Sequence, residues 1–291
     1  MSTSFRPAIC YSQNFLKDPR LVAWLLKQSS IGPDDVVYEI GPGKGIITAQ
    51  LALRSKQVIA IEQDPRLAAL LRQHFAQRPN VTIHARDFLD YRLPRKPYKV
   101  FANIPFTITT PIVTRLTTAD NPPEDAYLAM QQEAAERFLG MPRESLYSVL
   151  LKPWFEVELV HRFRRQDFVP EPSVDVVMVR LHKRGPPLVS RAERQCFRDF
   201  VVYGFTRWRP TLGAILKGIF SGRQLKQISR TVGFGLDATP TSLTSEQWLS
   251  LFACFQERAN EQAWQAIAGS EQRLIQQQNR LQKAHRTRLG E

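Results

Sequence analysis

Cysteine is scarce in this sequence, and its three residues, Cys10, Cys196 and Cys254, lie far apart. None of them belongs to a Cys-x-x-Cys or Cys/His spacing, so the pattern indicates neither a zinc site nor a disulfide framework. Long apolar runs are also missing, and the polar and aromatic residues 1–17 do not form a secretory h-region. We therefore expect a soluble cytoplasmic protein without a metal and without membrane contact.

Acidic residues are outnumbered, with 27 Asp and Glu against 40 Lys and Arg, a formal net charge of +13. The excess is concentrated in residues 183–291, which hold 17 basic and 8 acidic side chains. This balance favours a nucleic acid over a small metabolite as the partner. Charge alone does not distinguish a nucleic-acid-binding protein from one that is merely basic.

Short β-branched runs alternate with helical patterns, which is typical of an α/β domain with a mainly parallel sheet. The expected strands are 36–40, 58–62, 81–84, 100–104 and 126–130, and the expected helices are 46–54, 65–76 and 132–139. Two later runs, 148–163 and 174–181, are predicted as strands that pair antiparallel at one end of the sheet.

The segment Lys183-Arg-Gly-Pro-Pro187 interrupts regular structure and is the expected domain boundary. The predicted organisation is a catalytic domain over 1–182, a linker over 183–187, a basic helical domain over 188–269 and a Gln/Arg-rich tail over 270–291. Helical periodicity covers 191–205, 211–220, 221–232 and 245–258. We expect the tail to be a frayed helix or to order on meeting a partner.

A glycine-rich turn, Gly41, Gly43 and Gly45, follows the first predicted strand, where glycine lets the backbone approach a ligand closely. The dinucleotide pattern G-x-G-x-x-G fails because its third glycine position is Ile46, and no Walker pattern is present. A tight turn without a ligand remains the alternative for this segment taken alone.

Acidic residues near three successive strand ends favour a ligand. Glu39, Glu62 and Asp87 would meet at the carboxyl edge of a parallel sheet, although each taken singly is typical of a solvated carboxylate. Glu62 suits ribose hydroxyls, Asp87 suits the amino group of adenine, and Glu39 suits the glycine turn or a cationic group. Together they indicate S-adenosyl-L-methionine rather than NAD.

The fourth strand ends in Asn103-Ile-Pro-Phe106. The Asn103 side-chain oxygen and the Ile104 backbone carbonyl would accept the two N6 hydrogens of an adenine, and Phe106 would stack on the base. In isolation the tetrapeptide favours a strand end followed by a turn with an incidental aromatic residue, because a four-residue match is common by chance. Its place after the cofactor acids predicts methyl transfer to adenine N6.

With Ser12-Gln-Asn-Phe-Leu16 added to these motifs, residues 10–182 resemble the rRNA adenine N6-methyltransferase family, which includes the Erm macrolide-resistance enzymes and the KsgA group. The resemblance implies a Rossmann-like class I methyltransferase fold, an α/β fold whose mainly parallel seven-stranded sheet has helices on both faces, plus a small C-terminal helical domain. It implies Phe168 as a second aromatic that sandwiches the flipped base opposite Phe106. The implied cofactor-binding residues are Gln13, Asn14, Leu16, Gly41, Glu62, Gln63, Asp87, Phe88 and Asn103.

Within the family, the segment Ile9-Cys-Tyr-Ser-Gln-Asn-Phe15 and the Asn-Ile-Pro form resemble Erm enzymes more than the KsgA group. This implies a monomer that methylates one adenine of 23S rRNA, free or as a precursor, and confers macrolide, lincosamide and streptogramin B resistance. Phe106 and Thr107-Ile-Thr-Thr110 depart from the usual pattern, which leaves the number of methyl groups open.

Five arginines are candidates for contact with RNA phosphates, and a steep salt dependence of RNA binding would follow. They are Arg162, Arg164, Arg165, Arg207 and Arg209, the last two on either side of Trp208. For Arg207 and Arg209, a solvated surface beside a buried Trp208 is the alternative. Three other functions stay open: a KsgA-type enzyme acting on small-subunit rRNA, a non-catalytic RNA-binding factor, and a DNA adenine methyltransferase, which usually carries Asp-Pro-Pro-Tyr.

Overall fold

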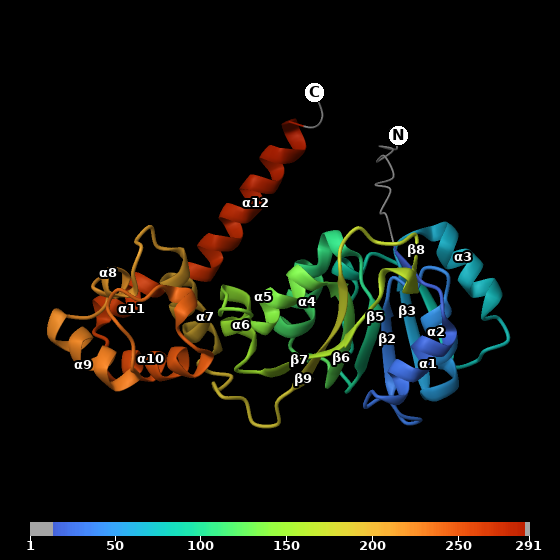
Figure 1. Cartoon of the computed structure of the whole chain (residues 1–291), viewed down its shortest axis with the longest axis horizontal. Helices are drawn as coiled ribbons and strands as arrows, with labels where there is room; N and C mark the ends of the chain where they lie inside the picture. Colours follow the sequence, from blue (N-terminus) through green and yellow to red (C-terminus); the bar gives the residue numbers. More distant parts are fainter. Residues whose placement is uncertain (1–13, 289–291) are drawn as a thin grey trace. The chain divides into compact units, whose positions relative to one another are not determined.

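The computed structural model describes residues 14–288, with side chains for residues 14–280 (Figure 1). The chain forms two compact units. The first holds the residues up to Ala135 together with Glu156–Lys183, and the second holds Glu136–Phe155 together with the residues from Arg184 onward. Each unit is described separately below.

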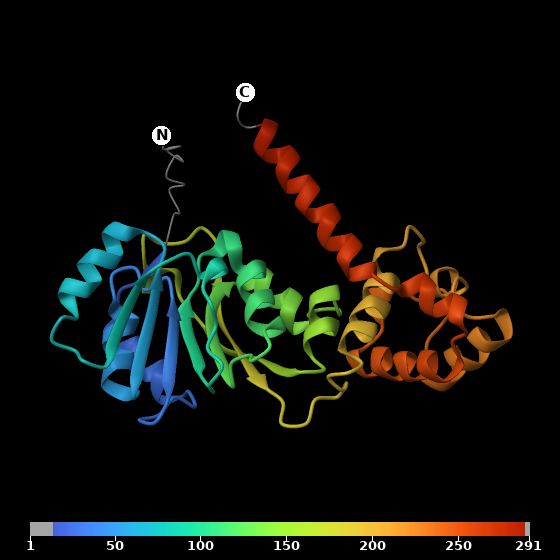
Figure 2. The ribbon, with the colours of Figure 1, turned by 180° about the vertical axis from the view of Figure 1, so that it is seen from behind.

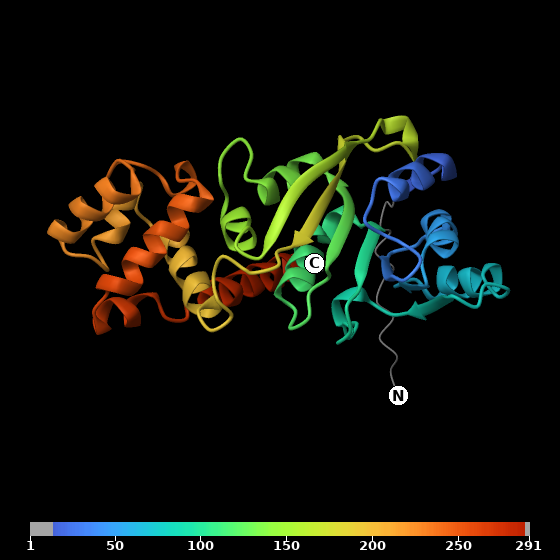
Figure 3. The ribbon, with the colours of Figure 1, turned by 90° about the horizontal axis from the view of Figure 1, so that it is seen from below.

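A seven-stranded sheet forms the first unit, in the order β4-β3-β2-β5-β6-β9-β7. The five strands from β4 to β6 are parallel, and β9 runs antiparallel to β6. Figure 3 shows β7 beside β9 at one end of the sheet. The strands are β2 (Val36–Ile40), β3 (Gln57–Glu62), β4 (Val81–Ala85), β5 (Lys99–Asn103), β6 (Asp125–Gln131), β7 (Phe155–Arg162) and β9 (Val176–Lys183).

Helices cover both faces of this sheet: α1 and α2 lie on the face toward the viewer in Figure 1, and α4 on the face toward the viewer in Figure 2. Two of the helices begin at an Asp-Pro pair, in which Asp18 or Asp64 accepts a backbone N–H of the first turn and the proline occupies the first turn. The helices are α1 (Pro19–Lys27), α2 (Ile46–Arg54), α3 (Pro65–His74), α4 (Thr109–Thr118) and α5 (Gln132–Leu139).

A two-stranded ribbon and three short 3-10 helices complete the first unit. In the ribbon, Phe15 pairs with Val169 and Leu16 pairs with Phe168. These elements are β1 (Phe15–Leu16), β8 (Phe168–Val169), η1 (Phe88–Asp90), η2 (Phe106–Ile108) and η3 (Arg165–Asp167).

The prediction of one long strand over 148–163 is wrong in its first half. Residues Leu146–Leu151 form helix α6, and only Phe155–Arg162 is a strand. The helix begins at a capping box in which Ser145 and Ser148 satisfy each other's backbone N–H groups. Residues 136–155 belong to the second unit. The later boundary between the two units falls after Lys183, within the predicted linker 183–187.

The second unit is helical and has a core of its own. Trp248, Phe197, Phe200 and Phe255 are fully buried in it. Gly204 lies against Trp248, where an added Cβ would be 2.5 Å from the indole. Its remaining elements are α7 (Arg194–Thr206), α8 (Leu212–Leu216), α9 (Gly222–Val232), η4 (Pro240–Ser242), α10 (Ser245–Arg258), α11 (Glu261–Ile267) and α12 (Ser270–Arg288).

The predicted tail forms α12, and its first turn is anchored on α7. Buried Asp199 accepts the backbone N–H groups of Gly269, at 3.1 Å, and of Glu271, at 2.8 Å. The Glu271 carboxylate pairs in turn with Arg198. These contacts fix the start of a helix whose residues 275–280 are all exposed.

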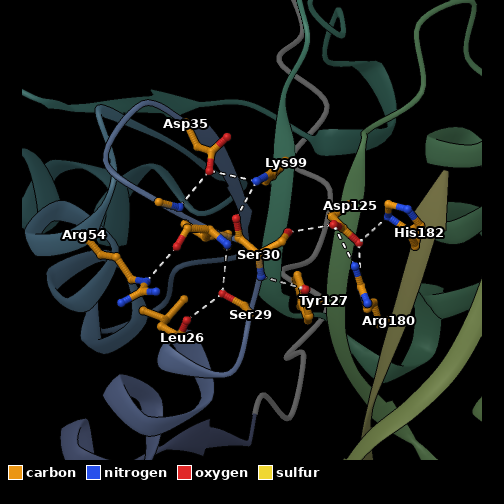
Figure 4. Close-up of polar contacts among 12 residues, drawn as sticks. Leu26, Ser29, Ser30, Asp35, Arg54, Lys99, Asp125, Tyr127, Arg180 and His182 are labelled. Atoms are coloured by element: carbon orange, nitrogen blue, oxygen red, sulfur yellow. Dashed lines mark hydrogen bonds and ion pairs between the residues drawn. The ribbon is translucent and has the colours of Figure 1, made fainter. Parts of the chain in front are cut away.

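A polar network lies at the amino edge of the sheet (Figure 4). The buried Asp125 carboxylate accepts the Ser30 hydroxyl at 2.6 Å and two Arg180 nitrogens at 2.8 and 3.1 Å. The Tyr127 hydroxyl accepts the Ser30 backbone N–H at 2.9 Å. The network therefore fixes the segment after α1 to β6 and β9.

No helix in the described part of the chain is long and apolar enough to span a membrane. Across the same residues, no group of three or more His, Cys, Asp or Glu side chains is placed to hold a metal ion.

Replacing Asp125 by Ala is expected to lower the free energy of unfolding by about 3 kcal/mol, because Arg180 loses its buried partner. Burial alone would raise the pKa of Asp125, but the bonds from Arg180 and Ser30 outweigh it and lower the pKa. This stabilisation is therefore present at neutral pH and lost as the pH falls through the lowered pKa. Urea unfolding measures the free energy of unfolding of the Asp125→Ala variant. If that variant lost no more free energy of unfolding than Asp34→Ala, at an exposed position, the prediction would be contradicted.

Candidate active site

The carboxyl ends of the parallel strands bring the predicted acidic residues to one edge of the sheet. In the register, Ile40 of β2 lies beside Ile61 of β3, and Glu62 lies beside Ala85 of β4. The Gly41 N–H donates to the Ile61 carbonyl at 3.0 Å, so the chain leaves β2 directly over the end of β3.

The backbone conformation of the turn after β2 and the side chains packed against it both require glycine. Gly41, Gly43 and Gly45 have φ values of 66°, 55° and 81°, in the left-handed region that disfavours other residues. A Cβ at Gly43 would lie 2.2 Å from the Phe15 ring. The Gly43 N–H donates to a Glu62 carboxylate oxygen at 3.2 Å, so the turn packs between β1 and the end of β3.

Glu62 and Asp87 shape the loops after their strands. Glu62 is buried and also accepts the Asp64 N–H at 2.9 Å. Asp87 accepts the Leu89 N–H at 2.8 Å and the Gln63 side-chain amide at 3.4 Å. A carboxylate has about four lone-pair sites, so both groups keep capacity for ligand hydroxyl and amino groups. Phe88, the next residue after Asp87, has a buried ring.

Glu39 is buried beneath the glycine turn, where it accepts the Thr48 hydroxyl at 2.6 Å. Its other carboxylate oxygen has no hydrogen-bond partner among the described residues. Burial, followed by the nearby Glu62 carboxylate, raises the pKa of Glu39 to about 8, although the Thr48 bond opposes the shift. No pattern in the sequence singled out Thr48, which lies in the first turn of α2.

The raised pKa of Glu39 predicts a stability that declines with pH. The neutral carboxyl stabilises the fold fully below its ordinary pKa of 4.5, and this contribution is lost as the pH rises through about 8. A Glu39→Gln variant keeps an acceptor for Thr48 and is expected to lose less free energy of unfolding between about pH 5 and pH 9 than the wild type.

Denaturant unfolding at a series of pH values measures this difference, and Glu133→Gln, at an exposed position of α5, is the matched control. Parallel pH profiles for the wild type and Glu39→Gln would contradict the assignment.

A small pocket opens at the end of β5. Asn103 donates from Nδ2 to the Asn14 carbonyl at 2.6 Å. Its Oδ1 is buried and has no partner among the described residues. Because a backbone carbonyl only accepts, the contact fixes which way the amide points and leaves Oδ1 as a free acceptor. The pocket is lined by Asn14, Phe15, Gly41, Asn103, Ile104, Pro105 and Phe106.

Hydrogen bonds and burial fix other predicted site residues of the first unit. The Ile104 N–H donates to the Ala129 carbonyl at 3.2 Å, which fixes the peptide beside Asn103. Asn14 donates from its side chain to the Pro170 carbonyl at 2.8 Å, and Leu16 is buried in β1. Gln13 lies outside the described residues. The sequence analysis did not identify Phe15 as a lining residue, although it lies inside the quoted motif.

Phe168 occupies a different environment from Phe106. Phe106 is partly buried and lines the pocket, whereas Phe168 is fully buried, with its ring centroid 5.3 Å from that of Phe163. Phe168 belongs to the core because β8 pairs with β1 and turns this side chain inward beside Leu16. As placed, the ring presents no face to a base, so the sandwich with Phe106 stays a prediction.

Three of the predicted arginines lie in the first unit and contact neighbouring polar side chains. Arg162 donates to Gln132 at 2.9 Å, Arg164 pairs with Asp167 at 3.2 Å, and Arg165 pairs with Asp175 at 3.1 Å. The Arg164 and Arg165 side chains are both exposed, so these pairs are weak and leave the guanidinium groups available to phosphates.

Arg207 and Arg209 lie in the second unit. The Arg207 guanidinium is 4.3 Å from the centroid of the Tyr203 ring, and both arginines are exposed. The alternative of a buried Trp208 is wrong, because the residue is fully exposed.

Comparison with known proteins identifies the family. Residues 5–257 match the family model described as ribosomal RNA adenine dimethylase. The chain belongs to this family. Its members are methyltransferases that act on rRNA adenines, so the expected enzyme class is confirmed.

Both branches of the family are represented among the relatives. An rRNA adenine N-6-methyltransferase of Bacillus licheniformis is 29% identical over 255 residues, covering 87% of this chain and 88% of that protein. The ribosomal RNA small subunit methyltransferase A of Latilactobacillus sakei is 32% identical over 263 residues, covering 86% and 89%.

A solved structure supports the fold of this ribosomal RNA adenine dimethylase family member. The 23S rRNA methyltransferase ErmE is 34% identical, with a TM-score of 0.76 over 84% of this chain and 100% of that structure. The predicted Rossmann-like methyltransferase fold with a C-terminal helical region is thereby confirmed.

Proposed function

We propose that this chain transfers a methyl group from S-adenosyl-L-methionine to N6 of a single adenine in 23S rRNA, acting as a monomer in the cytoplasm on free or precursor rRNA. The modification would confer macrolide, lincosamide and streptogramin B resistance. The observation that carries the proposal is the buried, unpartnered Asn103 Oδ1 in a pocket beside Phe106. The similarity to ErmE supports the choice of 23S rRNA.

The residues at the edge of the sheet fit the cofactor. The buried Glu62 carboxylate suits ribose hydroxyls, Asp87 with Gln63 would suit the polar edge of adenine, and Phe88, the residue after Asp87, belongs to the same proposed set. Gly41, Asn14, Leu16 and Asn103 complete the proposed set, together with Gln13. When bound, S-adenosyl-L-methionine supplies an electrophilic methyl, which forms the new N–C bond as its S–C bond breaks.

The acceptor side of the pocket acts by orienting adenine N6. Asn103 Oδ1 and the Ile104 carbonyl each accept one N6 hydrogen, which favours a pyramidal nitrogen whose lone pair is free to attack. Pro105, with φ of −59°, fixes the backbone directly after these acceptors, and Phe106 offers a face to the base. The methylated amine then releases one proton, and water suffices as the base because a cationic aryl amine is strongly acidic.

An Asn103→Ala variant is expected to methylate rRNA at least about 100-fold more slowly, because the principal acceptor for N6 is lost. Transfer of labelled methyl groups measures the rate, and thermal unfolding verifies the fold. Asn121→Ala is the matched control, since Asn121 only donates to the Pro94 and Lys96 carbonyls. Asn103→Ala transferring methyl groups at the wild-type rate would rule out this mechanism.

A KsgA-type activity on small-subunit rRNA is the second candidate, and the similarity to the Latilactobacillus sakei enzyme favours it. Incubation of the protein with labelled cofactor and separately purified 16S and 23S rRNA tests the two targets. We expect label at one adenine of 23S rRNA, and digestion to nucleosides then counts the methyl groups per adenine. Label confined to neighbouring adenines of 16S rRNA would favour the second candidate instead.

Arg162, Arg164, Arg165, Arg207 and Arg209 remain the proposed contacts to the rRNA backbone. Flipping the target base out of its stack costs a few kcal/mol, which contacts to the flanking phosphates offset. Since such contacts release counterions, the affinity for rRNA should fall steeply with salt.

A further inference from the structure

Trp208 is fully exposed in the segment between α7 and α8 of the second unit. The residues before it, Thr206 and Arg207, and the residues after it, Arg209 and Pro210, are exposed as well. A tryptophan without any burial is unusual, because its large apolar surface is normally covered. The whole indole surface is therefore available to a binding partner, and tryptophan is enriched at interfaces.

The local backbone fixes Trp208 at the apex of a tight turn. The Arg209 N–H donates to the Arg207 carbonyl at 2.8 Å, a bond that encloses Trp208 alone. Pro210 restricts Arg209 to extended conformations. On the other side, Arg207 packs over the Tyr203 ring, and Tyr203 is buried on α7. The indole is presented from a restrained backbone, which lowers the entropy lost on binding.

The chemistry around the indole selects the partner. Trp208 lies between two arginines in the sequence, in a part of the chain with 17 basic and 8 acidic residues. A base that is paired within a duplex hides its faces against its neighbours, whereas an unpaired base exposes one face for stacking. A protein-binding hot spot is normally ringed by further apolar contacts, but the neighbours of Trp208 in sequence are arginines.

We propose that Trp208 is a stacking platform for one unpaired base of RNA, with Arg207 and Arg209 contacting the phosphates on either side of that base. The inference rests on the proposed function for the identity of the polymer as RNA. It adds Trp208, as a residue that binds a base, to the phosphate contacts already proposed for Arg207 and Arg209.

Binding of the full-length protein to a fluorescently labelled 12-nucleotide single-stranded RNA, and to the same strand in a blunt duplex, tests the proposal by anisotropy. Trp208→Ala should weaken single-strand binding by about 5- to 100-fold and leave duplex binding unchanged. Trp208→Phe should retain most of the affinity, because it keeps an aromatic face. Trp24→Ala, at a half-exposed tryptophan of α1, is the control and should bind as wild type.

Salt dependence separates stacking from charge. Arg209→Ala should reduce the slope of log affinity against log salt by about 1, whereas Trp208→Ala should leave the slope unchanged. Wild-type affinity of Trp208→Ala for the single strand would overturn the proposal and indicate a protein partner for the indole. Equal losses for single strand and duplex would overturn it too.

The same preparations distinguish this inference from the proposed function. If the wild type binds the single strand through Trp208 but transfers no methyl group to rRNA, the proposed function fails and the stacking site stands. If rRNA is methylated and Trp208→Ala binds RNA as the wild type does, only the stacking site fails.

Discussion

The hydrogen bond from Asn103 Nδ2 to the Asn14 carbonyl orients the chemistry of the pocket. Because Nδ2 is the donor in this bond, Oδ1 is left as a buried acceptor, and an acceptor is the group that an adenine amine requires. The carbonyl is itself held in place, because the Asn14 side chain donates to Pro170 and the next residues pair with β8. The contacts of Asn14 with Pro170 and of its neighbours with β8 thus determine how Asn103, at the end of β5, presents Oδ1.

The fold supplies the rest of the site through the parallel sheet. Strand ends that are far apart in sequence meet at one edge, where Glu62 supports the glycine turn and burial raises the pKa of Glu39. Gly43 has no side chain because the Phe15 ring occupies that space. The cofactor side and the acceptor side of the proposed site therefore share the segment around Asn14 and Phe15, which lines the pocket.

The sequence predicted β2 over 36–40 and α2 over 46–54 as observed, because a short β-branched run and helical periodicity are local signals. It failed at Leu146–Leu151, since a short apolar run fits a strand and a buried helix equally well. Asn103 and Phe106 could be placed in one site from their order along the chain. The burial of Phe168 and the contact between Thr48 and Glu39 depend on how one element packs against another, which no local pattern encodes.

A crystal structure of this protein with an adenine-containing RNA and the demethylated cofactor would show whether Asn103 Oδ1 accepts a hydrogen from adenine N6. We expect adenine N6 to lie within about 3 Å of Asn103 Oδ1, with Nδ2 still donating to the Asn14 carbonyl. A complex in which the amide is reversed, or in which N6 is bound by other groups and Asn103 contacts no part of the base, would contradict it.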